Sequence, residues 1–219
     1  MNVTFYNVLK HTSAFSVLIP LLLCVIKYKS LNAISKIIFI YLAMCLVGES
    51  ALFGYYWYTG KSNHWIFRII GWLEFASLSV LFYRLIKMSN SVRVCYCLTI
   101  IIIYFIFVLE YIQNEGLYDP TPWFNALYFL FIIGCSIGYF YFYLKESEII
   151  RFRGQDVFYI ICGILLFFSV TFFVMLFENF INTADSSITR YVWSIVLVGN
   201  LFYNALISIG ILKSKNSIS

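Results

Sequence analysis

The sequence has few charged residues. Asp, Glu, Lys and Arg together make up 11% of the 219 residues, whereas 62% of the residues are hydrophobic. A soluble domain of this size leaves roughly a third of its chain's surface in water, and so few polar residues could not cover that surface. The scarcity of charge therefore excludes an ordinary soluble domain and indicates that the chain is surrounded largely by lipid.

Motifs that carry catalysis or bind cofactors are also missing. Two histidines, His11 and His64, argue against a haem held by two facing histidines and against a multi-histidine zinc site. No G-x-S-x-G, H-E-x-x-H, GxGxxG or Walker motif occurs. The last apolar stretch has no lysine between Arg190 and Lys213, so the lysine that a retinal protein needs is absent. We predict no cofactor, metal ligand or catalytic residue; an enzyme that works with two carboxylates stays an alternative.

The sequence does contain seven apolar stretches, each long enough for a membrane-spanning helix of about 20 residues. The connections between them are short. We therefore predict an all-α integral membrane protein, a seven-transmembrane-helix bundle that forms a single domain over residues 1–219. The predicted spans are 3–26, 36–58, 64–86, 94–113, 122–144, 157–180 and 188–212.

Basic residues are distributed unevenly among the connections. Alternate connections and the end of the chain hold eleven of them, whereas the opposite connections hold two, Lys61 and Arg190. Because cytoplasmic loops carry an excess of Lys and Arg, we predict an external N-terminus, a cytoplasmic C-terminus and a multi-pass location in the plasma (inner) membrane. The charge is spread over short loops, so we expect no nucleic-acid partner. The eleven residues are Lys27, Lys29, Lys36, Arg84, Lys87, Arg93, Lys145, Arg151, Arg153, Lys213 and Lys215.

Two glutamates, Glu49 and Glu74, interrupt the apolar stretches. At about 1.5 Å of rise per residue they lie about 13 and 15 Å below the outer ends of their helices, at nearly the same level. A charge at mid-helix costs about 2.5–3.5 kcal/mol, so such residues usually face the bundle interior. The small residues Gly48, Gly71 and Ser77 beside them favour a close approach of helices. We predict that both carboxylates border an interior polar cavity that opens outward.

Other polar and aromatic residues share the outer half of the predicted bundle. Trp72 and Tyr56 could hold a cation against their rings, and Asn200 could reach the interior from the last span. The full set of predicted ligand-binding or ion-binding residues is Glu49, Glu74, Arg68, Lys10, His11, Trp72, Tyr56 and Asn200.

Structural interpretations of these residues stay open beside the functional one. Each carboxylate could bond to Arg68 or Lys10 of a neighbouring helix, and long basic side chains can extend to the interface. Asn200, with Asn204 one turn further on, could join two helices by hydrogen bonds. Glu110 and Glu178 lie near helix ends, where interfacial water accounts for them.

Two functional hypotheses follow. In the first, a receptor-like or sensory protein binds a small ligand or cation in the outward-facing cavity and acts through a membrane signalling partner or a homo-oligomer, since its loops are too short for an effector domain. In the second, a small secondary transporter or channel subunit uses Glu49 or Glu74 as its cation or proton site. The inner halves of the spans are nearly free of charge, which favours the first. A membrane assembly subunit without a ligand is a third alternative.

The predicted orientation can be tested by labelling. A cysteine introduced at Ser62 should react with an impermeant thiol reagent added outside intact cells, while one introduced at Ser89 should react only after the cells are opened. The reverse labelling pattern would overturn the orientation.

Overall fold

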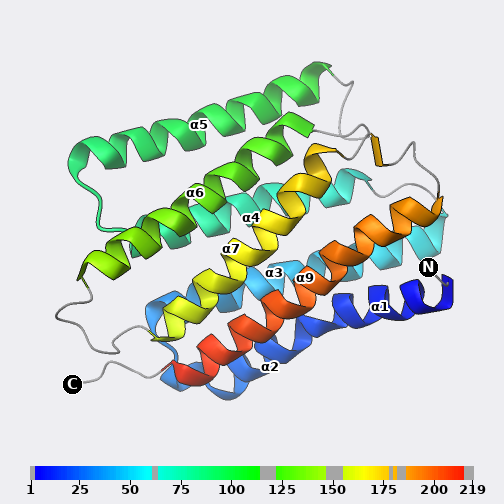
Figure 1. Ribbon diagram of the computed structural model, residues 1–219, viewed down its shortest axis with the longest axis horizontal. Helices are drawn as coiled ribbons and strands as arrows, with labels where there is room; N and C mark the ends of the chain where they lie inside the picture. Colours follow the sequence, from blue (N-terminus) through cyan, green and yellow to red (C-terminus); the bar gives the residue numbers. More distant parts are fainter. Residues whose placement is uncertain are drawn as a thin grey trace.

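The computed structural model describes residues 3–60, 64–113, 122–146, 155–177, 180–181 and 186–214, and these form a helical bundle (Figure 1). Six of the predicted spans are helices long and apolar enough to cross a membrane, so the chain is a multi-pass integral membrane protein. The remaining predicted span, 64–86, forms a helix of 22 residues. Among the described residues, this helix is not one of the six that are long and apolar enough to cross a membrane. The helices are α1 (Val3–Ser16), α2 (Leu18–Ile26), α3 (Ala33–Thr59), α4 (His64–Leu85), α5 (Asn90–Gln113), α6 (Pro122–Glu146), α7 (Gln155–Leu176) and α9 (Ser186–Lys213), with a 3₁₀ turn, η1 (Tyr28–Ser30).

The first predicted span is broken into two helices. α1 ends at Ser16 and α2 begins at Leu18. Pro20 explains the break, because proline has no N–H to donate to the carbonyl four residues earlier, which belongs to Ser16, and its ring crowds that carbonyl. The prediction of one continuous helix over 3–26 was therefore wrong in this detail, although the two helices together still have the length of one span.

α9 packs against helices from both ends of the chain. Figure 1 shows it between α7 and the α1–α2 pair, with α3 and α4 lying behind α6, α7 and α9 and with α5 at the edge. A side chain at Gly210 would place its Cβ 2.7 Å from the carbonyl oxygen of Asp156 and 2.7 Å from Cγ1 of Ile160. The absence of a side chain at Gly210 is thus what allows the backbones of α7 and α9 to approach so closely.

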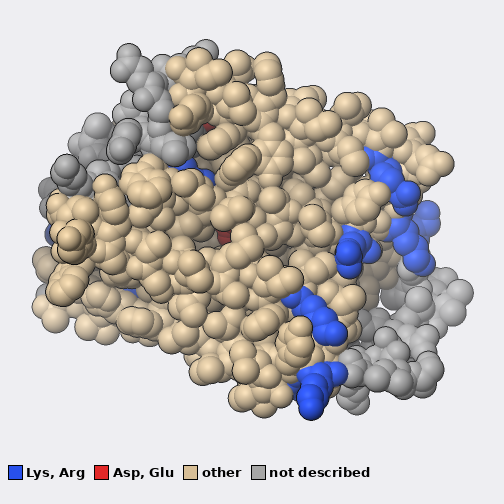
Figure 2. Space-filling model, turned by 180° about the vertical axis from the view of Figure 1, so that it is seen from behind, with Lys and Arg blue, Asp and Glu red and all other residues tan. Residues whose placement is uncertain are grey.

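Basic residues gather at one end of the bundle (Figure 2), where α4 and α9 end and where α3, α5 and α7 begin. Lys27 also has a structural role at this end. Its Nζ donates to the carbonyl oxygens of Ile211, Leu212 and Ser214 at 3.2, 2.6 and 3.3 Å, so its positive charge lies at the negative C-terminus of α9.

Polar side chains beside Lys27 complete the packing of this end. Asn32 caps α3 by accepting a hydrogen bond from the backbone N–H of Ser35 at 2.8 Å, and its amide nitrogen donates to Asp156 of α7 at 2.5 Å. The hydroxyl of Ser35 donates to that of Ser214 at 3.1 Å. These contacts join α3, α7 and the end of α9.

Replacing Gly210 with Ala should destabilise the bundle. The new Cβ would collide with backbone as well as side-chain atoms, and overpacking of this kind costs about 1–3 kcal/mol. Gly134→Ala in α6 is the matched control, because a Cβ there meets nothing within 4 Å. Thermal unfolding in detergent should show a clearly lower melting temperature for Gly210→Ala and little change in melting temperature for Gly134→Ala. Equal stability of the two variants would contradict the close α7–α9 contact.

Candidate functional site

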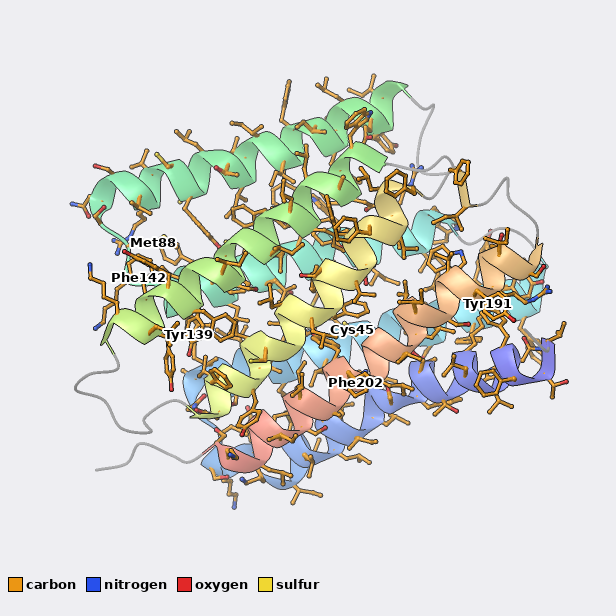
Figure 3. The ribbon with its side chains drawn as sticks, viewed as in Figure 1. Cys45, Met88, Tyr139, Phe142, Tyr191 and Phe202 are labelled. Carbon is orange, nitrogen blue, oxygen red and sulfur yellow. The ribbon has the colours of Figure 1, made fainter. Side chains whose placement is uncertain are left out.

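A cavity of about 320 Å³ lies among α1, α3, α4, α6, α7 and α9, in the half of the bundle remote from the basic end. Four of the predicted site residues line it: Glu49, Glu74, Lys10 and Asn200. Cys45 of α3, labelled in Figure 3, lies near the centre of the bundle and lines the same cavity. Further polar or aromatic members of the lining are Ser13, Tyr41, Phe53, Tyr128, Phe129, Phe167, Thr171, Trp193, Tyr203 and Asn204.

Glu74 is held by hydrogen bonds from two other helices. The hydroxyl of Tyr41 in α3 donates to its Oε1 at 2.5 Å, and the hydroxyl of Tyr128 in α6 donates to its Oε2 at 3.0 Å. Both tyrosines are buried and Glu74 is half-buried. The carboxylate therefore joins α3, α4 and α6 without a basic partner among these contacts, so the predicted alternative of a bond to Arg68 or Lys10 is not what holds Glu74.

Glu49 has a different environment. It is exposed within the cavity lining, and the described residues donate no hydrogen bond to it. Lys10 of α1 lies near enough to attract its charge, and Glu74 lies near enough for the two carboxylates to repel each other. Of the two carboxylates, Glu49 is the one whose oxygens accept no hydrogen bond from the described residues.

Two polar atoms in the cavity wall have no hydrogen-bond partner among the described residues. They are the hydroxyl of Tyr203, a residue only 4% exposed, and Oδ1 of Asn204, a residue only 3% exposed. The Tyr203 hydroxyl lies beside Tyr41 but completes no hydrogen bond. Leaving such a group buried and unsatisfied costs about 1–3 kcal/mol, so both atoms indicate a place for a ligand or a water molecule.

The two asparagines of α9 also join helices, as their structural interpretation predicts. Nδ2 of Asn200 donates to the hydroxyl of Ser13 at 3.0 Å, and Nδ2 of Asn204 donates to that of Ser16 at 2.8 Å. Both asparagines line the cavity. The hydrogen bonds fix α1 against α9 and hold Asn204 with its Oδ1 unsatisfied in the cavity wall.

The other predicted site residues lie elsewhere. His11 stacks on Phe53 with ring centroids 5.9 Å apart, and Tyr56 is 62% exposed. Trp72 stacks on Phe107, at 5.8 Å between centroids, on the side of α4 that faces α5. None of the three is among the residues that line the cavity.

Arg68 is buried close to Glu110 rather than beside Glu49 or Glu74. Glu110 is itself buried, and its carboxylate accepts hydrogen bonds from the backbone N–H groups of Trp123 and Phe124, each at 3.1 Å. It thus caps the N-terminus of α6 from α5. Interfacial water was the wrong explanation for this residue.

Sequence reasoning missed the tyrosines that hold Glu74 and the unsatisfied hydroxyl of Tyr203. It also expected Gly71 to lie at a close helix contact, whereas a Cβ there would meet nothing within 4 Å; at Gly48 a Cβ would lie 2.6 Å from Cδ1 of Ile70. Glu178 lies outside the described residues. Within the described ranges, no group of three or more His, Cys, Asp or Glu side chains is arranged to hold a metal ion.

Comparison of the chain with protein family models, with curated proteins and with solved structures finds no match.

The different environments of the two carboxylates predict different stabilities for their glutamine variants. Glu74→Gln replaces one accepting oxygen by an amide that cannot accept from a phenol, so a buried tyrosine loses its partner and the free energy of unfolding should fall by about 1–3 kcal/mol. Glu49→Gln breaks no hydrogen bond in the described part of the chain and should change it by about 0.5 kcal/mol or less. Denaturation in detergent measures both. A similar loss for the two variants would contradict the distinction.

Proposed function

We propose that this protein is a receptor-like or sensory membrane protein that binds a small cationic ligand in the cavity. In this proposal α4 completes a seven-helix bundle whose basic end faces the cytoplasm, so that the cavity opens outward in the plasma (inner) membrane. The observation that carries the proposal is the lining: an available carboxylate, Glu49, lines the same cavity as two buried polar atoms that lack partners, on Tyr203 and Asn204.

The charges of the lining favour a cation. Glu49 and Glu74 supply two carboxylates, and Lys10 is the single basic residue among the described lining residues. Aromatic faces from Tyr41, Tyr203 and other lining residues can hold a desolvated ammonium group. The volume lies at the lower end of the roughly 300–1,000 Å³ of ligand sites, so the part of the ligand that enters is small.

The inner half of the bundle supports binding rather than passage. Between the cavity and the basic end, Ile38, Leu81, Ile132, Ile164 and Ile207 are each 0% exposed. These apolar side chains pack between the cavity and the contacts of Lys27 and Asn32. A transporter or channel would have to reopen this packing, whereas a receptor can transmit a change of helix packing to a membrane partner or to a second copy.

Binding can be measured with the butyltrimethylammonium ion as the probe. It should raise the melting temperature of the purified protein in a concentration-dependent manner beyond that produced by equal sodium chloride, by an amount equivalent to about 2.7 kcal/mol at a hundred times its Kd. Glu49→Gln should weaken binding by about tenfold or more, because a contact with a charged group contributes about 1.5–3 kcal/mol.

Two tyrosine variants provide the matched comparison. Tyr203→Phe removes a hydroxyl from the cavity wall and should change the Kd of the probe. Tyr141→Phe removes a hydroxyl from a residue of α6 that is 61% exposed and should leave that Kd unchanged. No stabilisation by the probe, or the same stabilisation of the wild type and of Glu49→Gln, would contradict the proposal.

A further inference from the structure

A second hollow lies on the opposite side of Glu74. It is a groove of about 550 Å³ between α3 and α4. Its walls are apolar apart from Glu74 and Tyr41, and they include Met44, Ala51 and Trp65. α3 and α4 lie nearest the viewer in Figure 2, where the face away from the basic end is mostly tan and acidic atoms appear only as small recessed spots. We name this hollow the lateral groove.

The lateral groove faces the surroundings of the bundle. Among the residues that line it, Ile40, Val47 and Leu73 are 59%, 69% and 42% exposed. In a multi-pass membrane protein such apolar, exposed positions in the middle of long helices meet lipid chains. The groove is thus open to the hydrocarbon of the bilayer.

One layer of side chains separates the lateral groove from the cavity. Tyr41, Cys45, Ile70 and Glu74 line both hollows. Ile70 packs onto the bare backbone of Gly48, where a Cβ would lie 2.6 Å from its Cδ1 and 2.7 Å from its Cγ1. The wall at this point is therefore a flexible aliphatic side chain on a glycine, not a crossing of backbones.

We propose that the ligand is a single-chain cationic amphiphile that reaches the site sideways from the bilayer. Its ammonium head lies in the cavity by Glu49, its aliphatic chain lies in the lateral groove, and Ile70 moves to join the two hollows. This inference rests on the proposed function and adds the chemical class and route of the ligand. It explains why an apolar groove ends at a carboxylate, since a polar head and an apolar chain each meet the surface that suits it.

Photolabelling in lipid nanodiscs tests this proposal. The probe is dodecyltrimethylammonium with a diazirine at the last carbon of the chain, and mass spectrometry locates the labelled residues. Labelling should concentrate on the groove segments of α3 and α4 and should saturate. An excess of butyltrimethylammonium, whose head occupies the cavity, should suppress it by about a hundredfold at a hundred times that ion's Kd, if the two compete for one site and the photoprobe is kept well below its own Kd.

Variants separate the groove from the cavity. Ala51→Phe adds bulk to the groove only, at an exposed position, and should reduce groove labelling about tenfold, while leaving the stabilisation by butyltrimethylammonium unchanged. Ala205→Phe, at an exposed position on α9, is the matched control and should change neither. Leu73→Trp, also at an exposed groove position, fills the groove from α4 and should repeat the result of Ala51→Phe.

The outcomes distinguish the two proposals. If the diazirine labels the exposed side of α5 as strongly as the groove, or if butyltrimethylammonium does not compete, the groove holds ordinary lipid and the amphiphile proposal is wrong; the cavity proposal then stands on the thermal measurement. If butyltrimethylammonium fails to stabilise the wild type, the cavity proposal is wrong and the amphiphile proposal falls with it.

Discussion

Inside a membrane bundle a carboxylate has to be satisfied by other side chains, because the hydrocarbon around it offers no hydrogen bonds. Glu74 meets this requirement through the hydroxyls of Tyr41 and Tyr128. Each of these three residues comes from a different helix, so one carboxylate sets the relative positions of α3, α4 and α6. The cavity and the lateral groove both lie against this group of side chains, and their shapes depend on it.

The two glutamates therefore have different environments, although the sequence predicts the same role for both. Glu74 is bonded and half-buried, whereas Glu49 is exposed in the cavity with no hydrogen bond from the described residues. The fixed carboxylate maintains the architecture and adds negative charge behind the site. The available carboxylate can change partners. Under the proposed function, a ligand bound at Glu49 would leave the contacts of Glu74 between helices intact.

The sequence predicts the coarse fold because apolar length alone marks the long helices. The sequence also predicts that Glu49, Glu74, Lys10 and Asn200 lie in one region, because helix rise fixes their depth and unpaired polar groups avoid lipid. It does not predict the partners of Glu74: the chain has 18 tyrosines, and which of them reaches Glu74 depends on how neighbouring helices are rotated. The same rotation turns Trp72 toward α5. The break before α2 could have been read from Pro20 itself.

Because of that break, the two helices of the first span contact α9 separately. Ser13 and Ser16 join α1 to α9 through hydrogen bonds with Asn200 and Asn204, while Lys27, just past α2, donates to the last carbonyls of the same helix. α1 and α2 are separate helices joined at Val17, and both are bonded to one continuous helix, α9. Contacts made by α1 thus reach the middle of α9 directly, through Asn200 and Asn204, and not only by way of α2.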